Sequence, residues 1–197
     1  VQTCALPIEV YEQFVWSPRY IEAPVCRLRD ANWDGGEYSD GLEEVLYYCT
    51  DANMNVTALV RRDTEGQYWE DIIAERVTYD AYGKPTFYDW AWANASTGSS
   101  FANDRLYCGY WYDGSVGLYH VRNRVYHPRL GAWIQRDQLG YVDGMRLYGY
   151  CRNAPTDRVD PSGLQETQPS EPSSTQPSEI ELNYASGAWL HYMSGLG

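Results

Sequence analysis

The acidic and amide side chains of residues 30–35 have the spacing of a metal-binding loop. This segment reads Asp-Ala-Asn-Trp-Asp-Gly, with oxygen ligands at its first, third and fifth positions and Gly at its sixth. The same pattern opens the calcium loop of an EF-hand, in which a Glu at the twelfth position completes the ligand set. Here the twelfth position is Gly41. We therefore interpret residues 30–35 as a hairpin turn and predict no metal site and no cofactor.

The His and Cys residues do not form a reactive cluster in the sequence. There is no Cys-x-x-Cys pair and no His at ligand spacing from a Cys, which argues against a zinc site. The sequence also lacks a Gly-x-Ser-x-Gly elbow, a phosphate loop and a dinucleotide fingerprint. We therefore expect these side chains in the wall, core or surface of the fold: His120, His127 and His191, and Cys4, Cys26, Cys49, Cys108 and Cys151.

The net charge limits the classes of partner. The chain has 27 acidic and 15 basic residues, for a formal net charge of −12. Such a chain repels phosphate backbones and anionic lipid surfaces, so we expect no nucleic-acid partner. No apolar run approaches the roughly 18 residues that a membrane-spanning helix needs, so we expect no membrane span in this sequence.

The composition favours β structure. The sequence contains 19 Tyr and 8 Trp against only 3 Phe. Tyr and Trp have an apolar body and a polar tip, which suits half-buried pleated surfaces. Short β-branched and aromatic segments, such as 44–49 and 55–60, are separated by turn residues at 51–53 and 81–85. This spacing predicts β-hairpins in series.

Residues 118–126 alternate in polarity as an extended strand does. One face would carry Leu118, His120, Arg122 and Arg124, and the other Tyr119, Val121, Asn123 and Val125. Because the first of these faces is largely polar and basic, the alternation predicts that it is solvated or faces a lumen.

Composition also divides the chain into segments. Residues 1–8 match the translation of a common DNA-sequencing adapter, and we predict that they are not native. Hairpins are expected over 9–117, followed by a distinct segment at 118–164. The stretch 165–181 is dominated by Pro, Ser, Gln and Glu, so it cannot bury enough apolar surface to offset its ordering entropy. We predict that it is a disordered linker, with a short variable tail at 182–197.

Several of these segments resemble the Rhs/YD-repeat family. Residues 77–83, Val-Thr-Tyr-Asp-Ala-Tyr-Gly, are similar to a YD repeat unit, in which Tyr-Asp precedes a Gly turn. Residues 53–59, after a Tyr-rich strand, resemble an Rhs hairpin. Residues 118–131 resemble the Rhs core signature, and the similarity continues through residue 164. The resemblance covers about 11–164, and the ordered series from 118 onward is its most specific part.

The resemblance implies a fold and a role as a container. It implies an all-β architecture of serial hairpins that forms the end of a spiral, hollow β-shell, related to the C components of toxin complexes. A single hairpin cannot bury its own face, so each one relies on its neighbours. Such a shell would enclose a C-terminal polypeptide. The expected partners are the chain's own C-terminal tail and upstream shell repeats, with secretion machinery or cell-surface ligands as further candidates. The expected localisation is secreted or on the cell surface.

Two other functions remain as alternatives. The acidic, Tyr-rich and Trp-rich composition is also compatible with a cell-surface adhesion or carbohydrate-binding protein that is built on the same repeats and does not cut itself. A glycoside hydrolase would need a pair of carboxylates at a defined separation. Nothing in the sequence selects such a pair for a glycosidase, so this alternative ranks last.

The resemblance also implies a position for self-cleavage. Proteins of this family are cut just after the second of two Asp-Pro-x-Gly-Leu-like motifs. The second motif is intact here at residues 160–164, which places the cleaved bond between Leu164 and Gln165. The same boundary separates the aromatic-rich part of the chain from the predicted linker. The first motif corresponds to residues 137–141.

The chemistry that the resemblance implies is that of an intramolecular aspartyl protease. Asp137 and Asp160 would share the roles of acid and base, because two nearby carboxylates do not both ionise readily. Arg136 would orient a carboxylate or stabilise the developing oxyanion. Asp143 is a third carboxylate close in sequence.

Two departures from the family pattern leave active and inactive readings of this motif open. Gln138 stands where the family has Pro, which would fix the backbone of the turn, and Tyr141 stands where Leu is usual. Independently of any chemistry, Asp160-Pro-Ser-Gly is a good type I turn in which the Asp side chain caps the backbone.

Overall fold

The computed structural model describes residues 11–31, 42–61, 72–143 and 145–167. Some of the sequence predictions concern residues outside these ranges. They are the adapter-derived residues 1–8, the greater part of the calcium-like loop, and nearly all of the predicted linker and tail.

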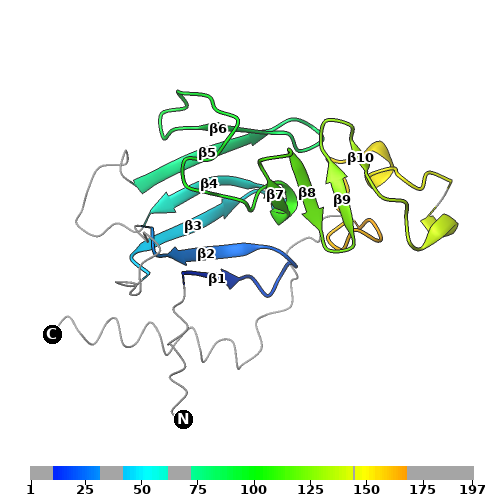
Figure 1. Cartoon of the computed structure of the whole chain (residues 1–197), viewed down its shortest axis with the longest axis horizontal. Helices are drawn as coiled ribbons and strands as arrows, with labels where there is room; N and C mark the ends of the chain where they lie inside the picture. The colour runs from blue at the N-terminus through cyan, green and yellow to red at the C-terminus, as the bar shows by residue number, and fades with distance from the viewer. Residues whose placement is uncertain (1–10, 32–41, 62–71, 144, 168–197) are drawn as a thin grey trace, which may run out of the picture.

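The first part of the chain folds into a six-stranded antiparallel sheet whose strands follow one another in sequence order. Each strand pairs with the next through consecutive hairpins, so the sheet is a meander (Figure 1). Its strands are β1 (Glu12–Trp16), β2 (Pro24–Arg29), β3 (Glu44–Thr50), β4 (Val56–Arg61), β5 (Ile73–Tyr79) and β6 (Pro85–Tyr88). The prediction of hairpins in series is confirmed.

A second, smaller antiparallel sheet lies against the far end of the first and has the order β10-β9-β8-β7 (Figure 1). No α-helix occurs among the elements of the described residues, so the all-β prediction is confirmed. The strands are β7 (Trp111–Asp113), β8 (Leu118–Val121), β9 (Arg124–His127) and β10 (Ala132–Trp133), and the 3-10 turns are η1 (Tyr107–Gly109), η2 (Gly140–Asp143) and η3 (Cys151–Asn153).

Three turns of the larger sheet share one device, an Asp that caps its own turn: the β3–β4 turn, the β5–β6 turn and the turn that follows β6. At Asp51, Asp80 and Asp89, the Oδ1 atom accepts hydrogen bonds from the amides two and four residues further on, at 2.8–3.0 Å. In the second of these turns Gly83 has a φ of +87°, and a Cβ there would lie 2.5 Å from the ring of Tyr107. Glycine is therefore required where the sequence predicted a Tyr-Asp turn.

The prediction of one alternating strand over residues 118–126 is wrong, because the chain turns back on itself at Arg122 and Asn123. Arg122 has a φ of 38°, and β8 and β9 pair as a hairpin in which Val121 lies opposite Arg124. The turn shifts the phase of the alternation. Arg124 therefore points inward with Val121 and is only 5% exposed, whereas we expected it on a face that is solvated or faces a lumen.

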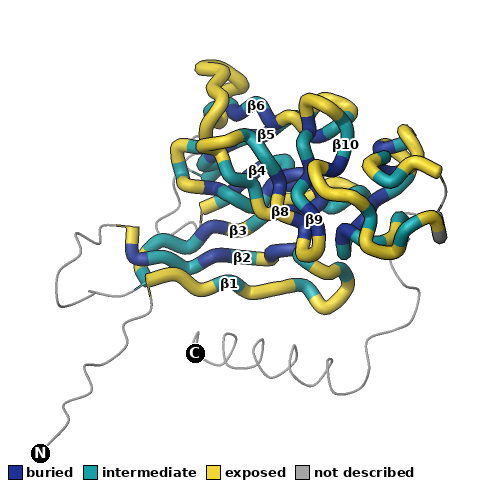
Figure 2. Tube along the Cα trace, turned by 45° about the vertical axis from the view of Figure 1, so that its right-hand side comes forward, coloured by how far each residue is buried: buried dark blue, intermediate teal, exposed yellow. Residues whose placement is uncertain are grey.

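A buried cluster of tyrosines lies where the two sheets meet, and Figure 2 shows buried chain concentrated around β8 and β9. The hydroxyl groups of these tyrosines find backbone acceptors: Tyr119 donates to the carbonyl of Gly83 at 2.7 Å, and Tyr126 to that of Tyr82 at 2.8 Å. A phenylalanine would leave these buried carbonyls unpaired. The excess of Tyr over Phe in the sequence is therefore explained by this core, whose tyrosines are Tyr107, Tyr110, Tyr119, Tyr126 and Tyr150.

The larger sheet contains a buried cation, Arg27, whose replacement tests how the sheet is held. The side chain is 1% exposed and donates to the carbonyls of Ala102 and Phe101, at 2.9 and 2.6 Å, while it contacts Glu44 at 3.3 Å. Arg27→Met should destabilise the full chain by about 3 kcal/mol, because it leaves buried acceptors without a donor. Urea unfolding measures the loss.

The matched control for this experiment is Arg29→Met, since Arg29 also contacts Glu44 but is more exposed. We expect a loss of at most about 1 kcal/mol for that variant. Equal losses for the two variants would show that the buried contacts of Arg27 do not stabilise the sheet more than an ordinary ion pair.

Candidate active site

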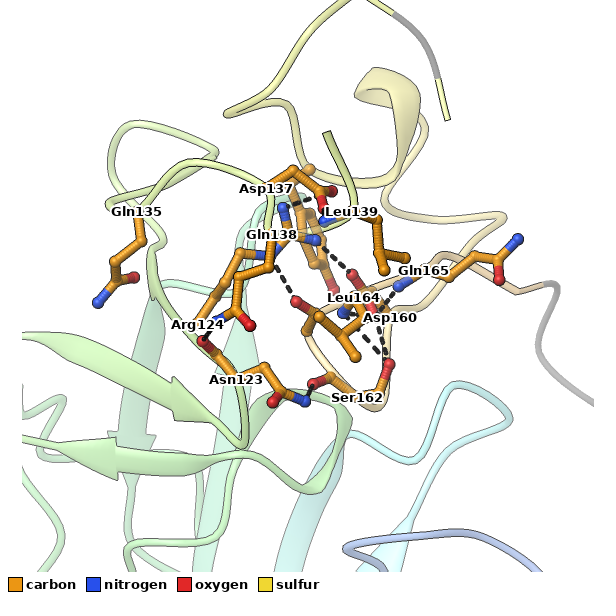
Figure 3. A network of polar contacts seen from close by, with 12 residues as sticks. Asn123, Arg124, Gln135, Asp137, Gln138, Leu139, Asp160, Ser162, Leu164 and Gln165 are labelled. Carbon is orange, nitrogen blue, oxygen red and sulfur yellow. Dashed lines mark hydrogen bonds and ion pairs between the residues drawn. The ribbon is translucent and has the colours of Figure 1, made fainter. Parts of the chain in front are cut away.

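The structure brings Asp137 and Asp160 to one point, on opposite arms of a single arginine (Figure 3). Arg124 Nη1 lies 2.9 Å from Asp137 Oδ2, and Nη2 lies 3.1 Å from Asp160 Oδ2. The two carboxylates are 23 residues apart in sequence and reach the arginine from separate loops. The pair that the sequence selected is thus assembled in space.

Further contacts fix the side chain of Arg124 in one position. Its Nε atom donates to the carbonyl of Gly163, one residue before Leu164. The guanidinium group also stacks over the ring of Trp133, 4.3 Å from its centroid. Because the planar group is fixed by its neighbours, it holds both carboxylates and the chain near residue 164 in a defined arrangement.

Asp160 also caps its own turn, but it does so inside the protein. Its Oδ1 accepts hydrogen bonds from the amides of Leu164 at 3.0 Å and Gln165 at 3.1 Å. Asp160 is 2% exposed, whereas Asp80 in the corresponding surface turn is exposed. The capped-turn interpretation of residues 160–163 is therefore correct, and the same carboxylate also lies beside the nitrogen of the Leu164–Gln165 bond.

The backbone of Asp160 is fixed by a residue from the tyrosine core. The hydroxyl of Tyr110 donates to the Asp160 carbonyl at 2.9 Å and accepts from its amide at 3.2 Å. Tyr110 itself is 1% exposed. The position of the carboxylate is thus set by the rigid core between the two sheets.

Asp137 is held by a turn of its own. Its Oδ1 accepts a hydrogen bond from the amide of Leu139 at 2.8 Å, and its amide donates to the carbonyl of Leu147 at 2.9 Å. Gln138, which stands where Pro was expected, donates through Nε2 to the carbonyl of Asn123 at 3.2 Å. This bond ties the turn to the β8–β9 hairpin, so Asp137 reaches Arg124 without the proline.

Burial raises the pKa of Asp160 above its ordinary value. The neighbouring guanidinium of Arg124 and the amides of Leu164 and Gln165 oppose this effect, but they do not cancel it. One guanidinium cannot neutralise two carboxylates, so a buried pair of this kind favours a state in which one carboxyl keeps its proton. The arrangement can therefore supply one acid and one base to a bond placed beside it.

Comparisons with known proteins agree with this fold. Toxin subunit YenC2 of Yersinia entomophaga is 27% identical over 143 residues, which is 73% of this chain and 14% of that protein. Toxin protein Tse5 of Pseudomonas aeruginosa is 43% identical over 56 residues, 28% of this chain and 4% of its own length. A crystal structure of TcdB2–TccC3 without its hypervariable C-terminal region aligns with a TM-score of 0.56 and 26% identity, over 78% of this chain and 6% of that one.

The chain is similar to Rhs-related toxin-complex proteins, as the sequence predicted. Its all-β fold is that of their shell proteins, although no family profile matches the sequence. This Rhs-related chain spans only a small part of the length of the relatives it matches.

Arg136, which the sequence selected as the third site residue, lies elsewhere in this Rhs-related fold. Its side chain is exposed, and its guanidinium lies 5.9 Å from the ring centroid of Tyr141. Arg124 is the arginine that contacts both carboxylates. Sequence reasoning missed it because the hairpin turn at Arg122 was not recognised. The side chain of Asp143 lies outside the described residues.

A cavity of about 400 Å³ opens beside the pair. One of its walls is η3, in which Cys151, Arg152 and Asn153 all have left-handed backbones, with φ values of 45°, 50° and 62°. Each such residue without glycine costs about 1 kcal/mol or more, so this wall is strained. Strain of this kind is found where a backbone must present side chains to a site.

The other reactive side chains do not join the site as ligands. His120 is exposed and packs on Trp111 with ring centroids 4.5 Å apart. Cys108 and Cys151 are buried free thiols. Within the described ranges, no three His, Cys, Asp or Glu side chains gather as a metal site would require, and no helix has the length and hydropathy of a membrane span.

Proposed function

We propose that this chain is the end of a hollow β-shell that encloses a C-terminal polypeptide, and that it cuts itself between Leu164 and Gln165. The observation that carries the proposal is the position of Asp160. Its Oδ1 lies 3.1 Å from the nitrogen of the bond to be cut, while its Oδ2 is joined through Arg124 to a second carboxylate. The self-cleavage is therefore assigned to Asp160 and Asp137.

In this proposal the two carboxylates have different roles. An amide nitrogen leaves only after it accepts a proton, so the group beside it must be an acid. Asp160 accepts the N–H of that nitrogen in the structure, and burial raises the pKa of its carboxyl. When water has added and the nitrogen becomes pyramidal, the nitrogen lone pair can take the proton that Asp160 carries, which suits the acid role. Asp137 then acts as the base that takes a proton from the attacking water. Water forms a bond to the carbonyl carbon of Leu164, the bond to Gln165 breaks, and Asp160 gives its proton to the leaving nitrogen. The new carboxyl group of Leu164 gives its proton to the resulting amine, so the products are a carboxylate and an α-ammonium. The proton that Asp137 took from the water returns to Asp160.

The relatives support the container role. The structure of TcdB2–TccC3 without its hypervariable C-terminal region indicates that the part preceding that region folds without it in that protein. By analogy, the residues of this chain up to 164 form the wall, and the residues after 164 are cargo. Secretion, with other toxin-shell components as partners, is the corresponding expectation.

The adhesion alternative is less well supported than the container. Its motivation was a surface rich in Tyr and Trp, but many of the tyrosines lie in the core between the two sheets, where their hydroxyls bond to buried carbonyls. The excess of Tyr is therefore explained without a glycan surface.

Intact-mass spectrometry of the natively purified full-length parent protein tests the cleavage. We expect two masses, one of which corresponds to a fragment that begins at Gln165. A single uncleaved mass would refute self-cleavage and leave a permanent scaffold. Cuts at other positions only would refute the assignment of the Leu164–Gln165 bond.

The proposed acid predicts how cleavage depends on pH. Because burial raises the pKa of Asp160, the carboxyl should keep its proton to a higher pH than the ordinary aspartate value of 3.8. The cleavage rate should therefore fall as pH rises through that raised pKa, by up to about tenfold per pH unit. The rate is measured after the uncleaved, urea-unfolded chain is diluted into buffers of different pH. A rate that rises continuously toward alkaline pH would contradict an acid role for Asp160.

A further inference from the structure

The three residues after the proposed cleavage site are held to the body of the protein at three points. The amide of Gln165 donates to Asp160 Oδ1 at 3.1 Å. The carboxylate of Glu166 contacts the guanidinium groups of both Arg152 and Arg158. Thr167 then pairs with a strand-like residue of the wall. This segment, residues 165–167, is thus bound at every position.

The third contact is a complete antiparallel bridge. The amide of Thr167 donates to the carbonyl of Val159 at 2.7 Å, and the amide of Val159 donates to the carbonyl of Thr167 at 2.9 Å. Val159 is 1% exposed and belongs to the core cluster, so the bridge is anchored on a rigid residue. Backbone pairing of this kind is how extended peptides bind to an exposed backbone edge.

The second contact is an ion-pair cluster in which two arginines surround the carboxylate of Glu166. The Glu166 side chain is 11% exposed although its neighbours in sequence are exposed. Arg152 reaches it from the strained turn η3, and Arg158 lies 3.3 Å from it on the strand-like segment that carries Val159. Two guanidinium groups around one partly buried carboxylate form a binding site for an acidic side chain, with the arginines as donors.

We propose that the surface formed by Arg152, Arg158 and Val159 is a clamp for the first residues of the C-terminal segment, and that it keeps hold of them after the bond is cut. The inference rests on the proposed self-cleavage for its second half only. Before cleavage the clamp positions the Leu164–Gln165 bond against Asp160. After cleavage it retains the new N-terminus of the cargo. The ligand class is an extended peptide with an acidic residue at its second position.

Hydrolysis does not weaken this clamp. Water adds its oxygen to the carbonyl carbon of Leu164, the C–N bond breaks, and the nitrogen of Gln165 takes up protons to become an α-ammonium. That nitrogen already donates to Asp160, so the donor changes from a neutral amide to a charged ammonium and the bond is strengthened. The contacts of Glu166 and Thr167 lie downstream of the cut and are unchanged by it.

Hydrogen exchange of the full-length parent protein tests the clamp, because retention inside a closed shell could not by itself protect a particular amide. We expect the amide of Thr167 to exchange at least about tenfold more slowly than in an unstructured peptide, both before and after cleavage. Glu166→Gln should speed that exchange by about tenfold, since it removes the charge from two charge-assisted bonds.

Glu22→Gln is the matched control. Glu22 also contacts two arginines, Arg105 and Arg122, but it takes no part in the contacts around the bond that is cut. Exchange of Thr167 and the rate of cleavage should both be unchanged in this variant. If Glu22→Gln loosened Thr167 as much as Glu166→Gln does, the assignment of the acidic contact would be overturned.

The remaining outcomes separate the clamp from the protease. If the protein is not cleaved but the Thr167 amide is protected from exchange, the proposed self-cleavage is refuted and the positioning role of the clamp is supported. A cleaved protein in which Thr167 loses its protection on cleavage would retain the protease and overturn the retention of cargo. Exchange at the unstructured rate in both states would overturn the clamp altogether.

Discussion

Asp160→Asn should leave the Leu164–Gln165 bond intact, with a cleavage rate at least about a thousandfold below that of the unmodified chain. Asn has nearly the same shape as Asp, and its side-chain oxygen can still accept the amides of Leu164 and Gln165. The turn should therefore survive. The variant loses the carboxyl proton, which the leaving nitrogen needs. Mass spectrometry at several times after dilution from urea gives the rate.

Asp80→Asn is the control for this experiment. Asp80 also caps its turn by accepting two backbone amides, those of Tyr82 and Lys84, and it is exposed. The side chain of Arg124 bonds instead to Asp137, Asp160 and the carbonyl of Gly163. The cleavage rate should be unchanged in that variant. If both variants were equally slow, the effect would come from weakened turns. If Asp160→Asn were cut at the normal rate, the proposed acid would be excluded.

Asp137→Asn extends the same argument to the second carboxylate. It should also stop cleavage, because without a base the water is a weak nucleophile. The side-chain oxygen of Asn can accept the hydrogen bond from the Leu139 amide as well as that of Asp137 does, so the turn at residue 137 should keep its structure.

The capped turns and the change in composition could be recognised in the sequence because both are local. An Asp followed by Gly within a few residues indicates a capped turn, as found at Asp80 and at Asp160. The change in composition after Leu164 is likewise visible without a fold. The hydrogen bonds of an Asp-capped turn depend on the residue types within it, so the sequence indicates such turns directly.

The partner of the two carboxylates could not be predicted in the same way. A two-residue turn between β8 and β9 reverses which residues face inward, and polarity alternation does not reveal it. Arg136 was selected because it precedes Asp137, yet the contact comes from Arg124, thirteen residues before that aspartate. Tyr110 likewise fixes Asp160 from fifty residues away. Such contacts depend on how the two sheets meet.

Replacing Arg124 should have effects that replacing a nearby surface arginine does not have. Arg124→Met should abolish cleavage and destabilise the chain by about 3 kcal/mol at neutral pH, because two buried carboxylates lose their shared partner. Arg122→Met removes a neighbouring arginine that is 49% exposed in its side chain and pairs with Glu22. Its cost should be at most about 0.5 kcal/mol, with cleavage retained.

The pH dependence of this loss identifies its cause. Burial already raises the pKa of Asp160, and without the guanidinium the pKa should rise further. A raised pKa means that the folded state binds the proton more tightly than the unfolded state, so the folded variant is favoured at acid pH and loses stability as pH rises through the raised value. Urea unfolding at about pH 4.5 and pH 7.5 should therefore show a smaller penalty at the lower pH.

The triple variant Arg124→Met with Asp137→Asn and Asp160→Asn completes the test. Neutral amides need no counter-ion, so stability at neutral pH should recover by at least about half of the loss, while cleavage stays absent. Recovery of stability without cleavage would show that Arg124 stabilises the fold by compensating the charge of the two buried carboxylates. If stability did not recover, the loss in Arg124→Met would come from the packing of the Arg124 side chain against Trp133 and from its bond with the Gly163 carbonyl. Burial of the two carboxylates would then not depend on this arginine.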